Sequence, residues 1–252
     1  MRYLHPVTMK EKFVASGTYV HYKDGVETGS VEHWSIHEQP DGAQFIRVDD
    51  DWRKLDGSSV LLEAWRSPLV DGGYVERVDI SAFGPKKADV KRIKATFTVI
   101  DGVLEIGRTI DEQDREQFEM ELPDGYILAP ESLIFGGYEA SHLAVRPGEP
   151  MPVLSYLPTF LNASVAFRPT MYYQSARFIA DETLTLGDTT YEARRYAQLN
   201  PKTGETLILW VDKYDVLLRY TAQDEAYHAI LTQYSRRPDP ESTEGKDTQS
   251  DD

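Results

Sequence analysis

Polar and apolar residues alternate in short runs along most of the chain, and turn dipeptides separate these runs. Because side chains of a strand point alternately to the two faces of a sheet, this two-residue period is typical of half-buried β-strands. Asp-Gly lies between several of the runs, and it is the strongest short-range signal for a β-hairpin. The pattern therefore predicts a large antiparallel sheet with an up-and-down meander, and it places strands at 12–22, 29–38, 43–53, 59–66, 73–83, 90–100, 103–110, 116–122, 151–157, 163–168, 171–185, 189–199, 205–213, 216–222 and 226–235.

The alternation breaks at about 124–150. A short helix could open at Pro130 and run to about Leu143, although two adjacent glycines inside it each cost about 1 kcal/mol relative to alanine. We therefore expect a helical or loop insertion in this part of the chain.

The whole pattern predicts an all-β fold. We expect one large antiparallel, curled sheet of about 14 strands that forms a half-open or closed β-barrel with one short helical segment. This single domain spans residues 1–235. From residue 236 onward apolar residues vanish and Pro, Asp, Glu, Ser and Thr dominate, which predicts a disordered acidic tail at 236–252.

Three segments near the C-terminus carry a recognisable signature: 184–196 (LTLGDTTYEARRY), 204–213 (GETLILWVDK) and 216–220 (VLLRY). They resemble the closing strands of bacterial lipoprotein-carrier-like proteins of the LolA/LolB type and of the related DUF3108 group. The resemblance implies a half-open antiparallel barrel, a short helix on its concave side, here 130–143, and a hydrophobic ligand inside. The chain departs from these proteins because it has no lipobox cysteine and no export signal, so only the fold and an apolar cavity carry over.

Composition narrows the classes of partner. The net charge of −15 disfavours nucleic acids and anionic membrane surfaces, which call for Lys/Arg patches. The absence of cysteine excludes disulfides, thiolate metal sites and cysteine nucleophiles. No apolar run approaches the ~20 residues of a membrane-spanning helix, so we expect no membrane insertion. The N-terminus lacks the apolar core of a signal peptide, which favours a cytoplasmic location, although a chain that begins after a removed signal would look the same.

One candidate catalytic group follows from register arithmetic. If the turns at Pro40 and Asp56 have two residues each, Asp50 lies opposite Glu63, and His33 lies diagonal to Asp50. Two close carboxylates raise the pKa of one of them, which a general acid requires. His33 could then act as a base or as a proton relay. The alternative is that this face is simply an outer, solvated face.

The same arithmetic gives candidate ligand-binding residues. Trp52, Trp65 and His37 share the face of the candidate catalytic group, and the two indole rings could form the floor of a site for a planar or apolar ligand. On the opposite face Trp34 faces Arg47, which predicts a cation–π pair whose simplest role is structural.

Motifs for metal ions and cofactors are absent from the sequence. His33 and His37 would lie ~13 Å apart on a strand, and the acidic triplet 49–51 lacks the glycine and the distal glutamate of a calcium loop. Nucleophile elbows and glycine-rich phosphate loops do not occur. We therefore expect neither a metal nor a cofactor.

Three hypotheses for the function remain. The first is a binding protein that holds a hydrophobic or aromatic small molecule in the barrel cavity. The second is a cofactor-independent isomerase, lyase or hydrolase that uses the His/carboxylate group in the same cavity. The third is a scaffold that acts through its sheet edge or its acidic tail. The sequence leaves open whether the protein is an enzyme and how many copies associate.

Overall fold

The computed structural model describes residues 1–156, 158–200, 203–222 and 226–238. Within these residues the strands belong to one sheet of 15 strands. They are β1 (Lys12–Lys23), β2 (Val26–Glu38), β3 (Gln44–Trp52), β4 (Ser58–Arg66), β5 (Val75–Phe83), β6 (Arg92–Ile100), β7 (Val103–Ile110), β8 (Asp114–Glu121), β9 (Ile127–Leu128), β10 (Met151–Tyr156), β11 (Pro169–Leu186), β12 (Thr189–Leu199), β13 (Thr206–Val211), β14 (Leu217–Ala222) and β15 (Tyr227–Arg236).

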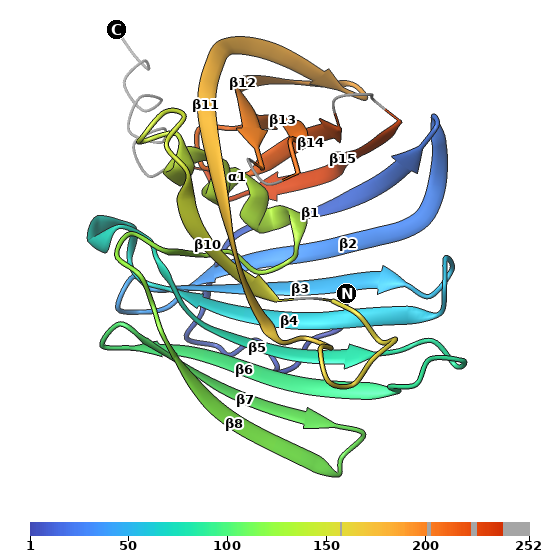
Figure 1. The fold of residues 1–252 in the computed structure, drawn as a ribbon. Helices are drawn as coiled ribbons and strands as arrows, with labels where there is room; N and C mark the ends of the chain where they lie inside the picture. The colour runs from blue at the N-terminus through green and yellow to red at the C-terminus, as the bar shows by residue number, and fades with distance from the viewer. Residues whose placement is uncertain (157, 201–202, 223–225, 239–252) are drawn as a thin grey trace, which may run out of the picture.

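The chain begins in the middle of this sheet. It meanders outward from β1 to β8, crosses to the opposite edge at β9, and returns inward to β15, which pairs with β1. All pairings are antiparallel except the short one between β9 and β10. The sheet is strongly curled, with β8 and β9 at its two ends, so that it forms an open barrel (Figure 1). The predicted all-β, curled antiparallel fold is thus confirmed.

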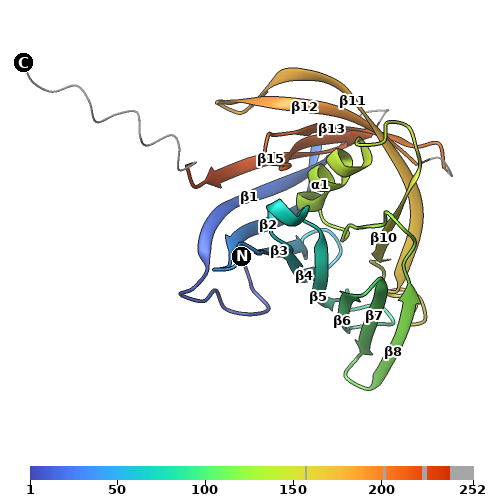
Figure 2. The ribbon, with the colours of Figure 1, turned by 90° about the vertical axis from the view of Figure 1, so that its left-hand side faces the viewer.

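One α-helix, α1 (Leu133–Leu143), lies on the concave side of the sheet, as Figures 1 and 2 show. It occupies the place where the alternating pattern breaks. One of the two glycines inside the helix, Gly137, is required by the packing around it. A Cβ atom there would come within 2.3 Å of the Asp215 carbonyl oxygen, so only glycine lets the connection between β13 and β14 approach the helix backbone.

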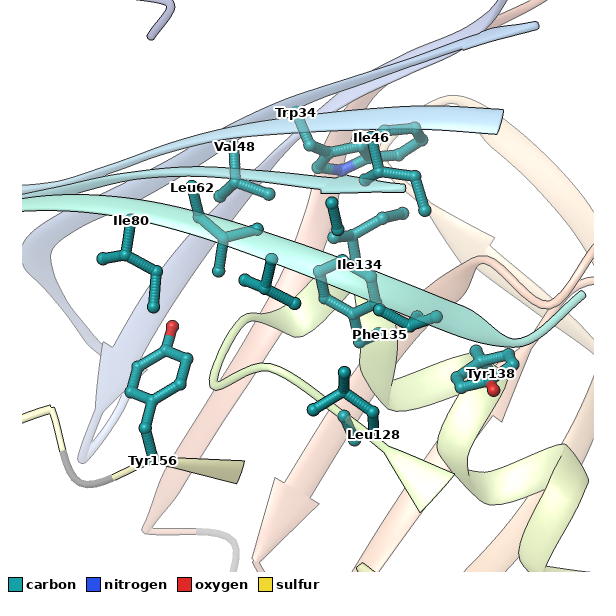
Figure 3. Close-up of a cluster of buried hydrophobic side chains, with 14 of the residues drawn as sticks. Trp34, Ile46, Val48, Leu62, Ile80, Leu128, Ile134, Phe135, Tyr138 and Tyr156 are labelled. Atoms are coloured by element: carbon teal, nitrogen blue, oxygen red, sulfur yellow. The ribbon is translucent and has the colours of Figure 1, made fainter. Parts of the chain in front are cut away.

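A core of apolar side chains packs between the sheet and one part of the helix (Figure 3). Trp34, Val48 and Leu62 come from neighbouring strands, lie on one face, and are at most 2% exposed. They face Ile134 and Phe135 of α1, which are also buried. The concave face is therefore the apolar face, and burial of these side chains holds the helix in the curl of the sheet.

The predicted strand at 163–168 is wrong. Asn162 begins a turn there, since its carbonyl oxygen accepts the N–H of Ala166 at 3.0 Å and its side chain accepts the N–H of Ser164 at 2.9 Å. The buried Phe167 stacks on Tyr156, with ring centroids 5.3 Å apart, and the Ala166 carbonyl accepts a hydrogen bond from Arg108 of β7. This loop therefore contacts both β7 and β10.

The predicted tail at 236–252 lies largely outside the described residues, and its first residue, Arg236, ends β15. A search of the described residues for a helix of the length and apolarity that crosses a membrane found none.

Candidate ligand-binding site

The predicted register between β2 and β3 is wrong by one residue. The N–H of Gln39 donates to the Ala43 carbonyl at 2.8 Å, so the loop has three residues, of which the last, Gly42, has a φ of 87°. His33 consequently lies opposite Asp49 instead of Val48. Because the side-chain period of a strand is two residues, a slip of one residue moves every side chain of the strand to the other face.

The register between β3 and β4 also differs from the prediction. Trp52 lies opposite Ser58, so the connection has five residues, and Asp50 lies opposite Val60. Glu63 lies opposite Arg47. The predicted Asp50–Glu63 pair therefore does not form.

The structure sorts the predicted site residues onto two faces of the sheet. Trp34, Asp50 and Trp52 belong to the concave face, whereas the convex face carries His33, His37, Arg47, Glu63 and Trp65. The predicted catalytic group of His33, Asp50 and Glu63 is therefore divided between the two faces. The predicted Trp34–Arg47 pair is also wrong, because Trp34 lies opposite Val48, and the Arg47 guanidinium lies 4.0 Å from the centre of the Phe45 ring.

On the convex face the N-terminal segment covers the charged residues. Arg47 bonds to Glu11 at 2.7 Å and lies 3.5 Å from Glu63, and all three side chains are buried. His5 contacts the other Glu63 oxygen at 2.6 Å, and Arg2 contacts Asp49 at 2.7 Å. These contacts hold residues 1–11 against the convex face of the sheet.

The remaining predicted residues of the convex face also make structural contacts. The Trp65 ring packs edge-on against Phe45, with centroids 4.4 Å apart, and lies under the Arg77 guanidinium. Burial lowers the pKa of His33, and burial together with the Arg47 charge lowers the pKa of His37.

The concave face holds a cavity of about 670 Å³. Its walls come from β1–β4, from the segment 129–132 with α1, and from β10–β15. Leucines of β13 and β14, four tyrosines and Trp52 supply the apolar surface, and the carboxyl groups of Glu32, Asp50, Asp56, Glu131 and Glu139 supply the charge.

The first carboxyl group is that of Glu32 on β2, which is 2% exposed. Its oxygens accept hydrogen bonds from the backbone N–H groups of Leu133 at 3.0 Å and Ile134 at 3.2 Å, and from the Ser132 hydroxyl at 3.0 Å. Ser132, the N-cap residue, makes no side-chain cap of its own, so Glu32 caps α1 from the sheet. Burial raises the pKa of Glu32 to about 7 against the opposing effect of these bonds.

Asp50 on β3 lies beside Glu32. Its Oδ1 accepts a hydrogen bond from the Trp52 indole at 2.5 Å. Burial, and then the neighbouring Glu32 charge, raises the pKa of Asp50 well above its usual range.

Two further carboxyl groups come from the segment that contains the helix. Glu139 on α1 is 9% exposed and accepts a hydrogen bond from the Gln198 amide at 2.6 Å. Burial and the Glu131 charge raise the pKa of Glu139 to about 8. Glu131 keeps surface that water can reach, but the surrounding walls still desolvate it enough to raise its pKa.

A buried histidine completes the polar part of the cavity. His21 on β1 is 6% exposed, and its Nδ1 lies 2.7 Å from the Tyr227 hydroxyl. Burial lowers its pKa to about 4, so the ring is neutral at pH 7. Its Nε2 has no hydrogen-bond partner among the described residues.

Sequence reasoning missed most of these residues. Glu32 lies opposite Asp50, and the predicted register, which was wrong by one residue, did not bring the two together. A usable signal was present in Glu131 and Glu139, which are two acids inside an otherwise apolar segment. In the described part of the chain, no three His, Asp or Glu side chains are grouped so that they could hold a metal ion.

Comparison with known proteins supports the fold. No protein-family model and no curated protein match this chain. A solved structure, described as the crystal structure of a beta-barrel-like protein of a domain of unknown function, DUF1849, from Brucella abortus, is similar with a TM-score of 0.51 and 6% identity. The match covers 92% of this chain and 100% of that one. It supports a barrel-like fold, as the lipoprotein-carrier resemblance implied, and gives no sequence evidence for that group itself.

Proposed function

We propose that this protein binds a small organic molecule with an aromatic or apolar body in the concave cavity. The observation that carries the proposal is the cavity itself. At about 670 Å³ it falls within the range of roughly 300–1,000 Å³ that ligand sites occupy. A filled core at this place would have argued against a binding protein.

The composition of the walls supports an amphipathic ligand. Leu207, Leu209 and Leu217 line the cavity from β13 and β14, and aromatic rings line it from several other strands. Tyrosine combines a large apolar surface with a polar tip, and a few polar groups within apolar walls are typical of ligand sites. Trp52 lines the cavity and remains a candidate binding residue, whereas Trp65 lies on the convex face.

An enzymatic role through His33, Asp50 and Glu63 has no geometric support, because these side chains lie on two faces of the sheet. We therefore propose binding without covalent chemistry.

Native mass spectrometry on freshly purified protein, compared with denaturing mass spectrometry, tests the proposal. We expect a small molecule that is lost only on denaturation. The matched variant is Gly136→Phe, because a side chain at this helix position points toward Leu209 and Leu217 in the cavity. Val145→Phe, at an exposed position just after α1, is the control.

The bound mass should disappear in Gly136→Phe and persist in Val145→Phe, with circular dichroism verifying that both variants fold. Binding of the molecule by all three proteins alike would exclude the cavity as its site.

A further inference from the structure

The cavity is lined by several acidic side chains and by no lysine or arginine among the described residues. The acidic residues are Glu32, Asp50, Asp56, Glu131 and Glu139. The one basic side chain is His21, which burial keeps neutral. Carboxyl groups withdrawn from water without a cationic partner are costly, and proteins usually pair them.

Three of these carboxyl groups lie around one tyrosine. Tyr156 of β10 is 4% exposed, and after burial the charges that raise its pKa most are those of Glu131, Asp50 and Glu32. Glu139 in turn interacts with Glu131. The carboxyl groups from β2, β3 and the helical segment therefore surround a common space.

Two of these groups have acceptor capacity left. Asp50 accepts one hydrogen bond, through Oδ1, and Glu139 accepts one, through Oε1. Among the described residues no donor reaches the second oxygen of either group. Glu32 differs, because the N-terminus of α1 already supplies three donors to it.

A second, independent feature also calls for a ligand. The Nε2 atom of His21 is buried and unpartnered, and its ring lines the same cavity. A buried polar atom without a partner costs about 1–3 kcal/mol. A ligand that forms a hydrogen bond with it removes that cost.

From these observations we infer that the ligand is an organic cation, such as an amine, whose charged group lies among Asp50, Glu131 and Glu139 while its body contacts the tyrosines. The inference rests on the proposed function, since it names the class of ligand for the same cavity. A cation is attracted to carboxylates and to the faces of aromatic rings. An anion would be repelled by the same groups.

The protonation of the empty cavity is compatible with this ligand. Burial raises the pKa of Asp50 well above its usual range and that of Glu139 to about 8, so Glu139 holds a proton near neutral pH when nothing is bound. An opposite charge within hydrogen-bond distance favours the ionised form. Glu32 and Trp52 are the groups that face Asp50, and Glu131 and Gln198 are those that face Glu139. None of them supplies a positive charge.

The test is a competition within a library of matched pairs, in which each arylalkylamine is accompanied by the corresponding alcohol, tryptamine and tryptophol among them. The protein is mixed with the library, separated by gel filtration, and its bound compounds are identified by mass spectrometry. We expect amines to be retained about tenfold more than their alcohols, which corresponds to about 1.4 kcal/mol.

Variants that lack the negative charges of the cavity test where the cation binds. Asp50→Asn and Glu139→Gln keep the shape of the side chains, and together they should abolish the preference for amines while the alcohols bind as before. Glu27→Gln, at an exposed position of β2, is the control. An amine preference that persists in the double variant would overturn the inference.

Two further outcomes separate the inference from the proposed function. Retention of alcohols equal to or above that of amines would overturn the inference and leave the binding function standing. If the wild-type protein retains no more of any compound than Gly136→Phe does, both the inference and the proposed function are wrong.

Discussion

The carboxylate of Glu32 accepts the backbone N–H of Leu133, 101 residues later in the chain, at 3.0 Å. This contact joins the central strand β2 to the first residue of α1. It takes the place of the missing local cap at Ser132. The N-terminus of the helix that bounds the cavity is therefore attached to the sheet through one buried side chain.

Removal of this carboxylate should weaken the attachment of α1. Glu32→Ala leaves the N–H groups of Leu133 and Ile134 without their acceptor, and we expect a loss of about 1–3 kcal/mol in the free energy of unfolding. Urea denaturation measures it. Glu32→Gln keeps one acceptor oxygen and should lose less, and Glu27→Ala, at an exposed position of the same strand, should change the stability little. Equal losses for Glu32→Ala and Glu27→Ala would contradict the capping role.

Because β1 passes close to Trp34, we expect position 17 to require glycine. A Cβ atom on Gly17 would lie 2.5 Å from the Trp34 ring and 2.8 Å from Leu231, and both side chains are buried. We expect Gly17→Ala to cost about 1–3 kcal/mol, since neither neighbour has space to move. Gly107→Ala is the matched control, because nothing lies within 4 Å of its Cβ position on β7. Thermal unfolding should separate the two, and a Gly17→Ala protein as stable as the control would show that the packing there is looser than described.

Because of its ion pairs on the convex face, we expect substitution of Arg47 to lower the free energy of unfolding strongly. Arg47→Met would leave the carboxylates of Glu11 and Glu63 buried without their shared cation, and breaking a buried pair in this way costs about 3–5 kcal/mol. Arg77→Met removes a pair in which the Arg77 side chain is 48% exposed, and such a pair contributes about 0–1 kcal/mol. Denaturation midpoints of the two variants provide the comparison. Comparable losses would mean that the N-terminal segment is not held in the way the structure shows.

The raised pKa of Glu139 predicts how stability changes with pH. Its pKa is 4.5 ordinarily and about 8 in the fold, so the folded state holds the proton between these values while the unfolded state releases it. The free energy of unfolding must therefore fall as the pH rises from 4.5 to 8, and the contribution of this group is fully present below 4.5.

Glu139→Gln should flatten this dependence, because the amide does not titrate and can still accept the bond from Gln198. Melting temperatures of wild type and variant between pH 5 and pH 8 measure the difference. Parallel curves would refute the assignment of the pH dependence to Glu139.

The sequence predicts the elements of this fold well and the faces of its sheet poorly. The Asp-Gly turns locate the hairpins, since glycines such as Gly25 and Gly102 adopt the positive φ that tight turns require. The helix was found because alternation stops there. The segment 163–168 alternates as a strand does, but it forms a loop, which depends on a distant contact between the Ala166 carbonyl and Arg108.

The candidate site was missed because register depends on loop length. The sequence Pro40-Asp41-Gly42 fits a two-residue or a three-residue loop, and the choice decides which face Asp50 occupies. The hydrophobic pattern did not settle the choice, since both faces of β2 and β3 bury charged residues. Glu32 lies on the concave face and Asp49 on the convex face, and both are buried.

The central claim is that the space between α1 and the leucines of β13 and β14 binds a ligand. The most direct measurement is a titration with the fluorescent probe N-phenyl-1-naphthylamine, whose emission rises in apolar surroundings. The account predicts saturable binding to wild type and to Val145→Phe, with loss of binding in a folded Gly136→Phe protein. Equal binding by all three proteins, or no saturable binding by wild type, would contradict it.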